Sequence, residues 1–120
     1  MSLNDISAYK KSFVLSNYVW EIVYKWTYFE KDTDGKQIVR AIDSISVNIA
    51  EGFGRYGKKD KIKFYFYSRG SLKESLDWNE KTRIRKLITK EEYEKIFKEL
   101  NSLSKEINML IKLTNDNLEI

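Results

Sequence analysis

The chain has no cysteine and no histidine among its 120 residues. Their absence excludes disulfides, thiol nucleophiles, an imidazole general base and zinc sites of the usual kind. Catalysis would have to rely on carboxylates, lysine or tyrosine alone. The composition therefore favours a protein that is not an enzyme, with no catalytic residues, no metal and no cofactor.

Long apolar segments are also missing. The sequence contains no run of eighteen apolar residues and does not open with a charged segment followed by an apolar one. A membrane-spanning helix needs about 20 mostly apolar residues, and a signal peptide begins with a charged segment that is followed by an apolar one. We therefore expect no membrane helix and, by default, a cytoplasmic protein.

Helical periodicity is present along almost the whole chain. Apolar residues recur at steps of three and four, which predicts an all-α domain over residues 1–120. The segment 30–35 has turn composition, 53–59 holds two glycines, and Thr89 with Glu92 forms a capping box that should begin the last helix. The expected helices cover residues 6–29, 36–53, 60–87 and 90–114.

The short connections predict an antiparallel up-down-up-down four-helix bundle. The first and third helices each carry apolar residues on two faces, more than one bundle core needs. Gly70 lies inside the third helix, and we expect it to allow close approach of another helix. Self-association into a closed homo-oligomeric ring would bury the surplus apolar faces.

In the second helix, Ile38, Ile42, Ile45 and Ile49 advance by four, three and four residues and form an apolar ridge, and in the last helix Ile96, Leu100, Leu103 and Ile107 keep the spacing of a bundle seam. A polar ridge runs beside the apolar ridge of the second helix, and we expect that helix to end through left-handed glycines at Gly52 and Gly54. We interpret the polar residues as a structural network between helices or subunits, in preference to a catalytic, ligand or metal cluster. If Arg69 is buried with Glu51 as its partner, Glu51→Ala would cost about 3–5 kcal/mol. The predicted network comprises Ser44, Asn48, Glu51, Arg69 and Glu74.

Positive charge is concentrated in one third of the chain. Residues 53–90 hold twelve Lys or Arg against four Asp or Glu, whereas residues 1–52 and 91–120 are net acidic. Such a segment can be a solvated helix face, but the balancing acids are scarce, and three tyrosines, Tyr56, Tyr65 and Tyr67, could stack on bases. The glycines fit no Walker motif. The predicted nucleic-acid-binding residues are Arg55, Lys58, Lys59, Lys61, Lys63, Arg83, Arg85 and Lys86.

Two sequence blocks carry a family resemblance. The first contains Ser44, Ile45, Asn48, Ile49, Ala50, Glu51, Gly52, Gly54 and Arg55, and the second contains Arg69, Gly70, Ser71, Leu72 and Glu74. In order and spacing they resemble the 23S ribosomal RNA intervening-sequence proteins, a family of four-helix bundles. The chain departs from the family in lacking proline near the first turn and in having Ser68 where alanine is usual.

The resemblance implies a homopentamer and an association with ribosomal RNA, because the family is encoded within intervening sequences of 23S rRNA genes. Related proteins accompany diversity-generating reverse transcriptases as basic accessory rings. Together with the charge distribution, this predicts a non-enzymatic protein that binds nucleic acid, RNA above all, through a basic surface. The alternative is a protein–protein scaffold that makes no nucleic-acid contact.

Overall fold

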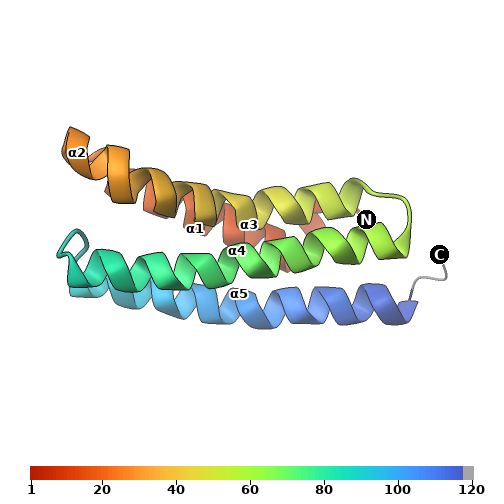
Figure 1. Cartoon of the computed structure of the whole chain (residues 1–120). Coiled ribbons are helices and arrows are strands. Elements are labelled where there is room, and N and C mark those ends of the chain that lie inside the picture. Colours follow the sequence, from red (N-terminus) through yellow and green to blue (C-terminus); the bar gives the residue numbers. More distant parts are fainter. Residues whose placement is uncertain (118–120) are drawn as a thin grey trace.

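The computed structural model describes residues 1–117, and within them every regular element is helical. A short 3₁₀ turn, Leu3–Asp5, precedes α1, Ser7–Tyr24. The one-turn α2, Tyr28–Glu30, continues through a π-helical segment, Lys31–Gly35, into α3, Lys36–Gly54. The longest helices are α4, Lys58–Ile84, and α5, Lys90–Asn117. Figure 1 shows the four long helices side by side in an elongated molecule of 49 × 23 × 21 Å.

The predicted position of the first turn was wrong. The chain leaves α1 at Lys25 and turns before Thr27, whereas the segment 30–35 is helical. Thr27 caps the next helix: its side chain accepts a hydrogen bond from the Glu30 amide, and the Glu30 carboxylate accepts one from the Thr27 amide. Thr27 and Glu30 thus form a capping box. The capping box predicted at Thr89 and Glu92 is confirmed and has the same two hydrogen bonds.

The core is built on the predicted isoleucine ridge of α3. Four side chains at steps of four, three and four residues are fully buried: Ile38, Ile42, Ile45 and Ile49. On α5, the seam of Ile96, Leu100, Leu103 and Ile107 is equally buried and belongs to the same core cluster. The 3.6-residue periodicity that predicted both ridges reflects their burial against neighbouring helices.

The buried face of α4 differs from the prediction. Its core positions are Tyr65, Ser68, Leu72, Ser75, Asn79 and Thr82, so most of the seam is polar. Carbonyl groups accept hydrogen bonds from the hydroxyls: Ser68 Oγ donates to Ile45 O of α3 at 2.8 Å, and Thr82 Oγ1 donates to Asn79 O at 3.0 Å. Asn79 Nδ2 donates to Tyr93 O at 3.2 Å, whereas its Oδ1 is buried with no hydrogen-bond partner among residues 1–117. The predicted apolar faces of this helix instead leave Phe66, Tyr67 and Ile84 largely exposed. Small polar residues with local acceptors can be buried at low cost.

Two explanations for glycines also need correction. No glycine among the described residues has a positive φ, so Gly52 and Gly54 do not end α3 as left-handed caps. Gly52 is required by packing, since a Cβ there would lie 2.7 Å from the Tyr65 ring. Outside the backbone of its own helix, no atom lies within 4 Å of a Cβ placed on Gly70, so no other helix of this chain approaches closely there.

The end of α4 was predicted at residue 87 but falls at Ile84. Lys86 adopts φ 62°, and the Leu87 amide donates to Thr82 O at 2.9 Å. A left-handed residue with this backward hydrogen bond is the Schellman arrangement, which stops a helix.

None of the helices in residues 1–117 is long and apolar enough to cross a bilayer.

Candidate nucleic-acid interface

The eight predicted binding residues lie at the two ends of α4. The N-terminal basic group comprises Arg55, Lys58, Lys59, Lys61 and Lys63, and the C-terminal basic group comprises Arg83, Arg85 and Lys86. A helix rises about 1.5 Å per residue, so Lys61 and Arg83 are about 33 Å apart along the axis. One chain therefore presents two basic groups, where the sequence suggested one continuous segment.

Two members of the N-terminal basic group are tied to backbone carbonyls. Lys61 Nζ donates to Phe53 O at 2.8 Å, at the C-terminal end of α3, where helix carbonyls lack intrahelical partners. Lys58 Nζ donates to Asn115 O of α5 at 3.2 Å. These cations hold helix ends together, and a nucleic acid would have to compete with the carbonyls for them.

The other members of this group are turned to solvent. Lys59 is exposed, and Lys63 lies 3.8 Å from Asp60 in a loose ion pair. Arg55 pairs with Glu51 at 2.6 Å and stands over the Phe64 ring, 4.5 Å from its centroid. Because exposed i,i+3 and i,i+4 pairs contribute little, these cations remain available to phosphates.

Within the C-terminal basic group, Arg85 has a structural role. Its Nη1 lies 2.9 Å from both carboxylate oxygens of Asp34, a residue of the π-helical segment that is only 7% exposed. A buried carboxylate needs such a partner, so this pair fastens the segment before α3 to the end of α4. Arg83, Arg85 and Lys86 are all exposed, and the pair with the buried Asp34 is what distinguishes Arg85.

A polar network surrounds Arg83. Glu80 accepts hydrogen bonds from Arg83, at 3.0 Å, and from the Tyr93 hydroxyl of α5. The hydrogen bond from Tyr93 is the main cause that lowers the pKa of Glu80, and the hydrogen bond from Arg83 lowers it further. The hydrogen bond between Tyr93 and Glu80 also raises the pKa of Tyr93. A hollow of about 420 Å³ opens beside this network. Its walls are formed by Arg83, Lys86, Ile88, Lys90, Tyr93 and Glu94.

The predicted structural network does not form as a unit within the chain. Glu51 pairs with Arg55, and Glu74 pairs with Arg40 of α3. Arg69 donates to Asn108 of α5 at 3.1 Å, so the predicted Glu51–Arg69 pair is wrong. Arg69 is half-buried because the seam of α4 runs one position earlier, through Ser68.

Two other polar residues of that ridge are bonded within their own helix. Ser44 Oγ donates to Arg40 O at 2.7 Å, and Asn48 Nδ2 donates to Ser44 O at 2.8 Å. They lie on α3 beside the isoleucine ridge, as their spacing predicted. Within residues 1–117, no group of three acidic side chains is arranged to hold a metal ion.

The three tyrosines expected to stack on bases differ in accessibility. Tyr65 is only 2% exposed, so its role in the predicted surface is wrong. Its ring fills the space opposite Gly52 instead. Tyr56 and Tyr67 are both exposed, the first in the connection between α3 and α4 and the second on α4. These two can still reach a ligand.

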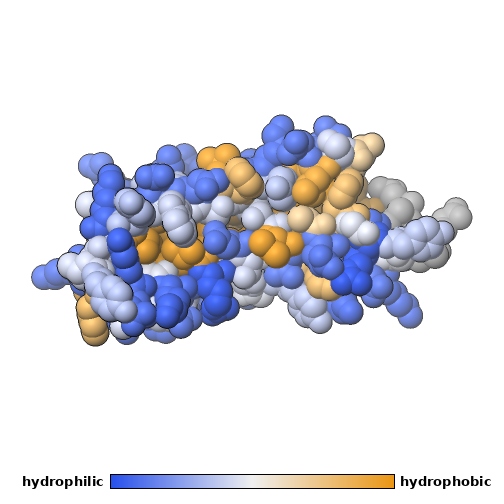
Figure 2. All heavy atoms as spheres, turned by 90° about the horizontal axis from the view of Figure 1, so that it is seen from above, coloured by the Kyte–Doolittle hydropathy of each residue, from blue (hydrophilic) through white to orange (hydrophobic). Residues whose placement is uncertain are grey.

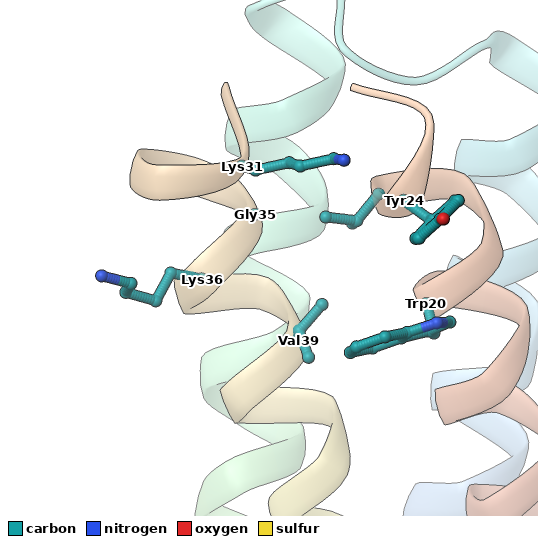
Figure 3. A pocket seen from close by; sticks show the side chains of 7 residues that line it. Trp20, Tyr24, Lys31, Gly35, Lys36 and Val39 are labelled. Carbon is teal, nitrogen blue, oxygen red and sulfur yellow. The ribbon is translucent and has the colours of Figure 1, made fainter. Parts of the chain in front are cut away.

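An apolar groove between α1 and the start of α3 was not singled out from the sequence. Figure 3 shows the Trp20 ring facing Val39 across it, with the Lys31 amine reaching toward Tyr24. The groove has a volume of about 330 Å³. Phe13, Trp20 and Tyr24 form an apolar stripe of α1, and each is half exposed or more. Figure 2, the view from above, shows apolar patches interspersed with polar residues. The surplus stripe was the signal that could have located the groove.

Comparison with known proteins agrees with the two sequence blocks. Residues 4–109 match the family described as 23S rRNA-intervening sequence protein. A protein of unknown function from the S23 ribosomal protein family of Bacteroides thetaiotaomicron is 24% identical, with 88% of this chain and 98% of that chain covered and a TM-score of 0.78. That likeness establishes the fold alone, and none of the curated proteins matches significantly. By its match over residues 4–109, the chain belongs to the 23S rRNA-intervening sequence protein family.

Proposed function

We propose that the protein binds nucleic acid, RNA above all, without catalysis and with little regard to sequence. The observation that carries this proposal is the charge of residues 53–90, twelve Lys or Arg against four Asp or Glu. Of these cations, Lys59, Lys63, Arg83 and Lys86 are exposed at the two ends of α4. When exposed lysines and arginines contact the phosphates of a nucleic acid, the counterions condensed on that nucleic acid are released. This release drives binding that tolerates any sequence.

The family description supports RNA as the ligand, since it refers to an intervening sequence of 23S rRNA. A protein that works on ribosomal RNA would act in the cytoplasm, and we propose that location. Glu80, whose pKa is lowered, is engaged with Tyr93 and Arg83. Its pairing is consistent with binding rather than with acid–base catalysis.

The proposed working unit is a homo-oligomeric ring of up-down-up-down bundles, a pentamer by family resemblance. Antiparallel order is supported by the contacts of Ile45 with Ser68 and of Arg40 with Glu74 on α3 and α4. Self-association is supported by the exposed stripe of α1, which includes Trp20. In a ring, the basic groups of each chain would repeat and strengthen the positive field.

A scaffold that binds only protein is the second candidate function. The apolar groove at Trp20 and Val39 favours it, because aromatic side chains are enriched at protein interfaces. The affinity of such a scaffold for its protein partner would depend on apolar contacts and not on the charge of phosphates. The two functions therefore differ in how binding responds to salt.

The test measures binding of purified protein to ribosomal RNA fragments and to random RNA and DNA across a salt titration, with light scattering in the same samples. The informative variant is Lys59→Glu/Lys63→Glu, because neither lysine caps a helix. The matched control is Lys98→Glu/Lys105→Glu, the same charge change at exposed positions on α5.

The proposal predicts that the Lys59/Lys63 variant loses about tenfold or more in RNA affinity at low salt, with a shallower salt dependence. The control variant should lose much less, since its charges lie outside the basic groups. If the two variants lose RNA affinity equally, only the net charge of the protein matters and the basic groups are not the binding site. If the parent protein binds neither RNA nor DNA at low salt, the protein-binding scaffold is the function that remains.

A further inference from the structure

A column of flat side chains leads from α5 to the hollow at the α4–α5 turn. The rings of Tyr93 and Phe97 are stacked, 5.9 Å apart and inclined by 17°. The Arg83 guanidinium stands over the Tyr93 ring, 5.1 Å from its centroid. Phe97 lies one turn further along α5 and Arg83 lies near the end of α4, so Tyr93 contacts a ring of its own helix and a guanidinium of the neighbouring helix.

Glu80 fixes the outer part of this column. One carboxylate oxygen accepts from Arg83 at 3.0 Å and the other accepts from the Tyr93 hydroxyl. Both groups that face the hollow are therefore oriented before any ligand arrives, and pre-organisation lowers the entropic cost of binding. The Arg83 side chain remains 46% exposed, so its outer surface is accessible.

Two further cations line the same hollow. Lys86 is exposed at the left-handed position that ends α4, and Lys90 lies 3.9 Å from Glu94 in a loose, exposed pair. Thr89 already caps the amide of Glu92. Side-chain ammonium groups, more than free helix amides, would therefore supply the attraction for an anion.

The other basic group lacks this arrangement. Arg55 also stands over a ring, Phe64, but Phe64 meets Tyr67 edge-on, at 88°. An edge-on pair does not build a column that a further flat group could extend. The two ends of α4 thus differ in geometry although they carry the same kinds of residue.

We propose that the hollow at the α4–α5 turn binds one nucleotide of a single-stranded RNA, with its base stacked on Arg83 and its phosphate held by Lys86 and Lys90. Unpaired bases stack on arginine planes as they do on aromatic rings, and a hollow of about 420 Å³ is within the size range of small-ligand sites. This inference rests on the proposed function and adds a base-dependent contact to its electrostatic one.

The test compares a single-stranded RNA of about twelve nucleotides with an abasic ribose-phosphate chain of equal length and charge. The informative variant is Arg83→Lys, which keeps the positive charge but removes the flat guanidinium. The matched control is Arg69→Lys, because Arg69 also stands over a ring, Phe66, but lies outside the hollow. Fluorescence anisotropy measures the affinity of each protein for both chains.

The parent protein and Arg69→Lys should bind the base-bearing RNA about tenfold more tightly than the abasic chain, the effect of stacking one base. Arg83→Lys should lose this preference and keep the salt dependence of the parent. If the parent binds both chains equally, or if Arg83→Lys retains the preference, the nucleotide site is overturned while electrostatic binding stands. If neither chain binds, the proposed function fails as well.

Discussion

The two ends of α4 carry similar cations but are fastened to the bundle by different interactions. At the N-terminal end, Gly52 packs against the Tyr65 ring and Lys61 caps the carbonyls of α3. At the C-terminal end, Arg85 holds the buried Asp34. The fold therefore uses Lys58 and Lys61 at the N-terminal end and Arg85 at the C-terminal end, while other cations at both ends stay exposed. A count of charges along the sequence overestimates the surface that is free to bind.

The largest expected effect on stability is at the C-terminal end. Arg85→Ala leaves the buried Asp34 without its partner, and we expect the free energy of unfolding to fall by about 2 kcal/mol, reduced by the partial exposure of Arg85. Chemical denaturation measures the change. Arg83→Ala is the matched control, since its pair with Glu80 is exposed and worth at most about 1 kcal/mol. Equal losses in the two variants would contradict a structural role for Arg85.

A smaller effect is expected at the N-terminal end. In Gly52→Ala, the new methyl group meets the Tyr65 ring at 2.7 Å and Lys61 O at 3.0 Å. Overpacking should outweigh the gain in helix propensity and lower the unfolding free energy by about 1 kcal/mol.

Gly70→Ala is the matched control for that substitution, because its Cβ has no neighbour within 4 Å. It should raise stability by roughly 0.5–1 kcal/mol, the helix preference for alanine over glycine. Thermal melting of the two variants should thus shift in opposite directions. A loss of stability in Gly70→Ala would indicate that another helix, from this chain or from another copy, does approach the site.

The smallest effect is expected at Glu51. Its side chain is 49% exposed and pairs with Arg55 one turn away, so Glu51→Ala should cost only about 0.3–0.5 kcal/mol. This value replaces the larger cost expected for a buried pair with Arg69. A loss of several kcal/mol, or a change of oligomer size in light scattering, would show that Glu51 becomes buried when chains assemble.

The fold was predictable wherever apolar residues alone occupy the core. The isoleucines of α3 and the seam of α5 follow the helical period without interruption, and both were identified correctly. The seam of α4 was missed because Ser68, Ser75 and Thr82 are polar, and burial of such residues depends on carbonyl acceptors that a sequence does not display. The first turn was misplaced although Thr27 and Glu30 carry the same capping signal as the last helix.

The candidate site was predictable in its residues but not in their partners. The basic segment was evident from composition, whereas the pairing of Arg85 with Asp34 joins residues 51 positions apart. Which carboxylate or carbonyl meets a given cation is decided by packing between helices. For the same reason, the stack of Arg83, Tyr93 and Phe97 could not be derived from spacing on one helix.

The most direct test of the account is the salt dependence of RNA binding by the unmodified protein. We expect the logarithm of the affinity for a short single-stranded RNA to fall linearly with the logarithm of salt concentration, with a slope of about −3 or steeper, as for four phosphate contacts on a single strand. Lys59, Lys63, Arg83 and Lys86 are exposed cations that would make four such contacts, and the exposed Arg55 and Lys90 could add to them. A slope near zero, or no binding at about 50 mM salt, would contradict the claim that the basic ends of α4 contact nucleic acid.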